Sequence, residues 1–252
     1  AAMANVGTES IGAYNAYLEG LSFRPCQVDL SCVAAHERAI GIDPEFAEAQ
    51  FQLAEYWRGQ LQLTRVNADP GIPYAEIEER FQRHVASAIE FVSSPVDLLK
   101  YRALRASGDM RLADHVELLL AYLESRPNDA ASWMDLALAQ QQMGDLAGSL
   151  PALKTAEQLN SRIELSVLLI NRYNTAGDSA NAARLARRVM IEASTSRNGL
   201  YQAHRGLLMA GEVSEAAEAA RLFHQNPIAD SDPTSAQVLD IRQACAEGRD
   251  AD

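Results

Sequence analysis

Histidine and carboxylate side chains are the first places to look for chemistry in this sequence. No two of the five histidines stand four residues apart, as a helical zinc pair requires, and no His-Glu-x-x-His motif occurs. Adjacent carboxylates such as Glu78 and Glu79 are typical of the wet face of an amphipathic helix, and a two-carboxylate mechanism also needs a pocket. The sequence has no Gly-x-Ser-x-Gly elbow, phosphate-binding loop or dinucleotide fingerprint. We therefore predict a non-enzymatic protein with no catalytic residues, no metal site and no cofactor.

The three cysteines, Cys26, Cys32 and Cys245, are too few for a disulfide framework and lack zinc-site spacing. We expect them to be small buried apolar residues. The alternative is a disulfide between Cys26 and Cys32, which would indicate an oxidising compartment.

The charge balance excludes several kinds of partner. With 22 basic and 34 acidic residues the net charge is −12, whereas proteins that bind nucleic acid or an anionic membrane normally carry a basic face. No apolar run approaches the roughly 20 residues that span a bilayer. Residues 1–5 lack the charged and apolar regions of a signal peptide and could begin a piece of a longer chain. We expect no nucleic acid, no membrane insertion and a cytoplasmic location, or a periplasmic one if the chain comes from a membrane-bound regulator.

Any binding residues must be positioned by helices. The composition is 48% hydrophobic but only 6% aromatic, with abundant Ala, which favours close helix packing. Apolar residues recur three and four apart between turn residues, and no stretch alternates as a strand would. Four glycine turns fall at 108, 144, 177 and 211, with spacings of 36, 33 and 34 residues. A fixed period in this range predicts a solenoid of helical hairpins.

The stretch 130–162 resembles the tetratricopeptide repeat (TPR). It has the typical residues of that family at matching places: Trp133, Leu136, Ala137, Gly144 and Ala156. Its departures are Gln140 in place of an aromatic residue, Ser161 in place of proline, and Pro151 inside the second helix.

The resemblance implies an all-α fold, a right-handed α-α superhelix (TPR solenoid) of about six helical hairpins plus a C-terminal capping helix. We expect a lead-in at 1–12, six hairpins over 13–230, and a capping helix and tail over 231–252. Asp232 would be the N-cap and Pro233 the first residue of that last helix. Its predicted apolar stripe, which would cover the open end of the stack, consists of Ala236, Leu239, Ile241 and Cys245.

The second hairpin requires an insertion near 61–73. Two prolines and a glycine there argue against a continuous helix. Long loops inside compact repeats are often functional, so Arg65 and Asn67 could reach a ligand at the edge of the groove. The alternative is a surface loop that has no role in binding.

The first unit is similar to a particular group of TPR modules. Its Tyr-x-x-Tyr-Leu-x-Gly opening at 14–20 and its Asp-Pro-x-Phe-Ala-x-Ala close at 43–49 resemble TPR modules of bacterial winged-helix regulators and nucleotide cyclases. This resemblance implies the sensory or partner-binding half of a signalling protein whose output domain is not in this sequence.

In the TPR family the first helix of each hairpin lines a concave groove. Aromatic, amide and cationic side chains over a shallow groove suit an extended peptide or a partner helix. Outward positions of the expected first helices are Phe51, Glu55, Arg58, Lys100, Tyr101, Leu104, Met134, Leu138, Gln141, Asn171, Asn174, Tyr201 and Arg205.

One ligand class is disfavoured at this groove. TPR modules that hold an acidic C-terminal tail use a clamp of Lys, Asn and Arg on the first helices. The matching places in the first three units hold Tyr17, Leu21, Gln52, Asp97 and Tyr101. Because the clamp is missing and the net charge is negative, an adaptor for acidic tails is not expected.

Two functions remain. The first is a non-enzymatic scaffold that binds a peptide, helix or protein partner in its concave groove. The alternative is a ligand-sensing module of a one-component transcription regulator or cyclase. Oligomeric state stays open, because the stripe of the last helix could also dock a second chain.

Overall fold

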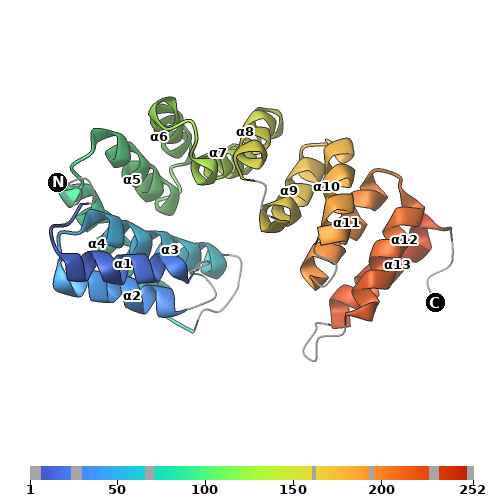
Figure 1. The fold of residues 1–252 in the computed structure, drawn as a ribbon. Helices are drawn as coiled ribbons and strands as arrows, with labels where there is room; N and C mark the ends of the chain where they lie inside the picture. The colour runs from blue at the N-terminus through green and yellow to red at the C-terminus, as the bar shows by residue number, and fades with distance from the viewer. Residues whose placement is uncertain are drawn as a thin grey trace. The chain divides into compact units, whose positions relative to one another are not determined.

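The computed structural model describes residues 7–23, 30–65, 71–160, 163–192, 196–226 and 233–248, and within these ranges it contains thirteen helices and no strand (Figure 1). The chain divides into two compact units, Ala1–Pro127 and Asn128–Asp252. Cys26 and Asn67 lie outside the described residues, so the alternative of a Cys26–Cys32 bridge and the proposed reach of Asn67 both fall there.

Unit 1 is a stack of three helical hairpins. Each pair packs along its length, and contacts between α2 and α3, α4 and α5, and α3 and α5 join neighbouring hairpins. Its helices are α1 (Ile11–Ser22), α2 (Leu30–Ile42), α3 (Ala47–Arg65), α4 (Tyr74–Phe91), α5 (Pro95–Gly108) and α6 (Leu112–Ser125).

Unit 2 repeats this arrangement and adds one helix. Its first helices α9 and α11 contact each other directly, and the last helix packs on both α11 and α12. The helices are α7 (Ala130–Gln142), α8 (Leu146–Leu159), α9 (Ile163–Thr175), α10 (Ser179–Glu192), α11 (Arg197–Met209), α12 (Val213–Gln225) and α13 (Pro233–Ala246).

The tight turns inside four of the hairpins share one backbone conformation. Gly144, Gly177 and Gly211 have φ of 85°, 78° and 80°, the left-handed region that glycine enters without steric cost. In the turn between α5 and α6, Met110 holds this conformation, with φ of 59°. The prediction of Gly108 as the turn residue was wrong, because it is the buried last residue of α5. The true turn positions are 110, 144, 177 and 211, so the intervals are 34, 33 and 34 residues.

Several helices begin where the sequence supplies a capping side chain. The Ser94 hydroxyl accepts a hydrogen bond from the backbone N–H of Asp97 at 3.2 Å, and Pro95 occupies the first turn, where its missing N–H costs nothing. The Asp129 carboxylate likewise accepts from the N–H groups of Ala131 and Ser132, each at 3.1 Å. These caps satisfy backbone donors that a helix start leaves without partners.

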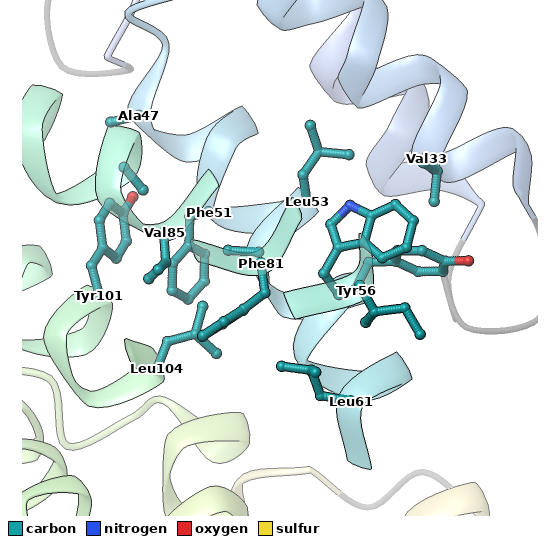
Figure 2. Close-up of a cluster of buried hydrophobic side chains, with 14 residues drawn as sticks. Val33, Ala47, Phe51, Leu53, Tyr56, Leu61, Phe81, Val85, Tyr101 and Leu104 are labelled. Carbon is teal, nitrogen blue, oxygen red and sulfur yellow. The ribbon is translucent and has the colours of Figure 1, made fainter. Parts of the chain in front are cut away.

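A large core cluster of unit 1 lies mainly between α3, α4 and α5 (Figure 2). Phe81 and Val85 of α4 are fully buried, as is Leu53 of α3, and Trp57 is 2% exposed. Burial of each large apolar side chain contributes about 1.5–3 kcal/mol. This cluster fixes the spacing of α3 and α5, which are the first helices of adjacent hairpins.

The insertion near 61–73 is partly helical, which corrects the prediction of a loop over that range. α3 continues to Arg65, and Leu61 is 1% exposed inside the core cluster. α3 and α4 have 19 and 18 residues, against 12 to 14 in the other helices. The Arg65 guanidinium donates to the backbone oxygen of Gly108 at 2.8 Å, so it secures the end of α5 instead of facing a ligand.

The last helix begins at Pro233, but its buried face differs from the predicted stripe. Leu239 is fully buried, as expected, whereas Ile241 is 51% exposed and Cys245 is exposed and free. Gln243 and Ala244 are buried instead, and Gln243 contacts His204 of α11 at 3.2 Å. The stripe was right for Ala236 and Leu239, which pack in one cluster with Leu200 of α11 and Phe223 of α12, and wrong for Ile241 and Cys245. α11 and α12 select a face of α13 that includes a polar residue.

Candidate functional site

A pocket of about 210 Å³ opens on the first helices of unit 1. Its walls come from α1, α3 and α5, the first helices of three successive hairpins, with one residue from α6. The lining residues are Tyr17, Glu48, Phe51, Gln52, Asp97, Lys100, Tyr101 and Tyr122. Side chains that are far apart in the sequence therefore meet at one place because the hairpins stack.

Aromatic rings form much of this wall. Phe51 and Tyr101 are stacked, with ring centroids 4.3 Å apart and planes inclined by 17° (Figure 2). The Lys100 ammonium lies over two rings, 5.6 Å from the centroid of Phe51 and 5.5 Å from that of Tyr122. Such distances allow attraction between the cation and the ring quadrupoles.

Glu48 and Asp97 bring negative charge to the pocket. Among the described residues, neither carboxylate is in an ion pair, and the buried Oε2 of Glu48 accepts no hydrogen bond. Burial raises the pKa of Glu48, and the nearby Asp97 raises it further, while a backbone hydrogen bond opposes the shift. A Cβ at Gly7 would lie 1.9 Å from Glu48 Oε2, so any other residue at position 7 would force this carboxylate to shift.

Tyr101 lines the same pocket as these acidic groups. It is 4% exposed, and within the described part of the chain its hydroxyl makes no hydrogen bond. Burial raises the pKa of Tyr101, and the charges of Glu48, Asp97 and Glu55 act in the same direction. Tyr101 therefore stays protonated at neutral pH, and its hydroxyl can donate a hydrogen bond to a ligand or accept one from it.

The pocket contains three of the six residues predicted for the groove in unit 1: Phe51, Lys100 and Tyr101. Glu55 is half-buried on α3, and Leu104 is 3% exposed within the core cluster. Arg58 donates to the Ser107 hydroxyl at 3.3 Å, which links α3 to α5.

The groove residues predicted for unit 2 are partly engaged with each other. The Arg172 guanidinium donates to Gln141 at 3.1 Å, and that of Arg205 donates to Asn171 at 3.0 Å, so amide and guanidinium groups bridge α7, α9 and α11. Tyr201 accepts from Arg242 of α13 at 3.0 Å. Across both units none of the thirteen predicted residues is fully exposed, and those below 9% exposure are Phe51, Tyr101, Leu104, Met134 and Asn174.

Sequence reasoning missed part of the pocket. Gln52 and Asp97 had been singled out only as places where an acidic-tail clamp is absent, and Tyr17 for that reason and as part of the opening motif. The structure puts all three in the pocket with Tyr101. Tyr122 was missed because it lies on a second helix. Glu48 belongs to the closing motif 43–49, and its negative charge in the first turn of α3 was the only signal in the sequence.

The described residues include no group of three or more His, Cys, Asp or Glu side chains placed to hold a metal ion. Over the same residues, no helix combines the length and apolar character needed to cross a membrane.

Comparisons with solved structures identify the fold. The chain is similar to PilW, a widely conserved type IV pilus biogenesis factor, with a TM-score of 0.64 and 13% identity over 91% of this chain and 99% of that one. PilF of Pseudomonas aeruginosa gives 0.58 and 14%, over 91% and 96% of the two chains. The TPR-like repeats of a putative kinesin light chain from Podospora anserina give 0.53 and 20%, over 73% and 95%.

No protein-family model matches the sequence. A search of curated proteins also found no significant match. The structural likeness confirms the predicted fold class, an all-α solenoid of TPR-type helical hairpins.

Proposed function

We propose that this chain is a non-enzymatic scaffold that binds a peptide segment or helix of a protein partner on its first-helix face. The observation that supports the proposal is the pocket of about 210 Å³, because three successive first helices contribute to it. An extended segment laid across α1, α3 and α5 could insert one side chain there while its backbone follows the stack.

The chemistry of the pocket resembles that of an interaction hot spot. Binding energy at interfaces concentrates in aromatic anchors that sit in desolvated pockets surrounded by polar groups. Here Phe51 and Tyr101 supply the aromatic surface, while Gln52, Glu48 and Asp97 supply polar groups in the same lining. In unit 2, the proposed surface comprises the partly exposed first-helix residues Leu138, Gln141, Asn171, Tyr201 and Arg205.

Site-specific photo-crosslinking tests this proposal. A photoreactive amino acid replaces Gln52 in the pocket wall or, as a control, Glu90 on the exposed side of α4. In the source cell we expect adducts with one or a few proteins from position 52 and none of the same adducts from position 90. Identical adducts from both positions, or none from position 52, would refute the scaffold role of this face.

A second candidate function has one supporting observation. Tyr17 belongs to the opening motif that resembles regulator and cyclase modules, and it lines the pocket. A small ligand bound there would make the chain a sensory module of a bacterial regulator, in the cytoplasm or, for a membrane-bound regulator, in the periplasm. A winged-helix or cyclase domain encoded upstream in the same gene would favour this candidate, and its absence would favour the scaffold.

A further inference from the structure

The pocket contains polar groups whose bonding capacity is unused. Glu48 has a buried carboxylate oxygen without a hydrogen bond, and Tyr101 is almost fully buried with a hydroxyl that meets no described partner. Buried polar groups in native proteins are normally satisfied, and a buried carboxylate is costly unless a positive group compensates it. The unpaired carboxylate oxygen of Glu48 therefore carries a desolvation cost that positive charge in the pocket would reduce. The Tyr101 hydroxyl, which solvent still reaches, can bond a ligand in the same pocket.

The rings around the cavity already hold a cation. The Lys100 ammonium lies between 5 and 6 Å from the ring centroids of Phe51 and Tyr122. The negative faces of these rings are thus directed toward a place where positive charge is favourable.

The charges in the lining leave room for another cation. The lining includes two carboxylates, Glu48 and Asp97, and one ammonium, that of Lys100. Glu55 of α3 is also close enough to influence Tyr101. An acidic group entering the pocket would meet this negative surplus with a single cation to offset it.

We infer that the pocket receives a basic side chain, lysine or arginine, from a peptide segment of the partner. Its cationic group would be held by the charge of Glu48 and Asp97 and by the Tyr101 hydroxyl oxygen. Its aliphatic stem would lie against the stacked rings of Phe51 and Tyr101. This inference rests on the proposed function, and it specifies the class of ligand.

Peptide pools test the charge preference directly. Four pools of short acetylated and amidated peptides share uncharged random flanks and differ in one fixed central residue: lysine, arginine, norleucine or glutamate. Fluorescence anisotropy with the full chain should show the lysine or arginine pool binding at least about 10-fold more tightly than norleucine, since a hydrogen bond to a charged group contributes roughly 1.5–3 kcal/mol. Glutamate should bind most weakly.

Variants separate the pocket from the general negative charge of the protein. Glu48→Gln and Asp97→Asn should each remove most of the preference for the basic pools, whereas Glu90→Gln removes the same charge from the exposed surface of α4 and should leave it unchanged. Lys100→Gln removes the resident cation and should strengthen binding of the basic pools several-fold. Thermal melts of all four variants establish that they remain folded.

The outcomes distinguish the two levels of the proposal. Equal binding of the norleucine and basic pools, tighter binding of the glutamate pool, or weaker basic binding by Lys100→Gln would overturn the inference while the scaffold proposal stands. Equal losses in Glu48→Gln and Glu90→Gln would show general electrostatic attraction and would also overturn it. Absence of binding by every pool would refute peptide binding at this face, and the inference would fail with it.

Discussion

Adding one carbon atom at Gly108 tests how α4 and α5 pack. A Cβ there would lie 2.2 Å from both Cε1 and Cζ of Phe81, far inside van der Waals contact. Phe81 is fully buried in the core cluster, so its ring cannot turn out into solvent to make room (Figure 2). Arg65 also bonds to the Gly108 carbonyl, which resists a shift of the backbone. Gly108→Ala must therefore strain the core.

The expected magnitude is the balance of two effects. Overpacking a well-packed core costs about 1–3 kcal/mol. Replacing glycine by alanine in a helix recovers up to about 1 kcal/mol in propensity, and less at the last helical residue. We expect Gly108→Ala to lower the free energy of unfolding by about 1–2 kcal/mol.

Urea unfolding followed by Trp57 fluorescence measures this change, because Trp57 lies in the same cluster. Trp133 is the second of two tryptophans in the sequence, and a Trp133→Phe background removes its signal. Gly41→Ala is the matched control. Gly41 lies in α2, and no atom stands within 4 Å of the place that an added Cβ would take, so this variant should gain a few tenths to about 1 kcal/mol.

The double variant Gly108→Ala with Phe81→Leu should be more stable than the sum of its single effects, since the shorter side chain makes room for the new methyl group. If Gly108→Ala instead gained as much stability as Gly41→Ala, the close approach of Gly108 to Phe81 would be wrong, and with it the packing of α4 on α5.

Three further variants have expected outcomes of known sign. Burial raises the pKa of Glu48, so its ionised form destabilises the fold at neutral pH. Glu48→Gln should therefore raise the melting temperature at pH 7, and the difference between variant and wild type should vanish as the pH falls below 4. A lower melting temperature of the variant at pH 7 would contradict this. Burial, with the charges of Arg83 and Arg80 adding to it, lowers the pKa of His84 to about 4. Between pH 6.5 and pH 4 the free energy of unfolding of the wild type should therefore fall by about 2–3 kcal/mol more than that of His84→Gln, as measured by urea unfolding. Equal acid sensitivity of the two proteins would show that His84 is not the source of the loss. Pro151 is exposed inside α8 and cannot donate a backbone hydrogen bond. Pro151→Ala should restore that bond and raise the melting temperature of unit 2 by an amount corresponding to about 1–3 kcal/mol. A decrease would show that the helix needs the proline.

The helical hairpins were predictable because their signals are local. Apolar spacing defines an amphipathic helix, and glycine marks a turn that needs positive φ, as at Gly144, Gly177 and Gly211. The prediction failed at Gly108 because Met110 adopts the left-handed conformation there despite its side chain. No local sequence pattern predicts a non-glycine residue with positive φ such as Met110, since the surrounding helices impose its conformation.

The candidate site was predictable only in part. Phe51, Lys100 and Tyr101 follow from the resemblance of the chain to a TPR array, which says which helix faces the groove. Glu48 and Tyr122 do not follow from it, because their place at the pocket depends on how α3, α5 and α6 pack.

The amino-acid sequence was enough to establish the all-α class, the repeat of about 34 residues and the negative net charge, since each depends on composition or on spacing along one helix. The face that α13 buries, the helical extension to Arg65 and the meeting of Glu48, Asp97 and Tyr101 came from the packing of helices against each other. Packing brings together residues from separate hairpins, and spacing within any one helix carries no information about such distances.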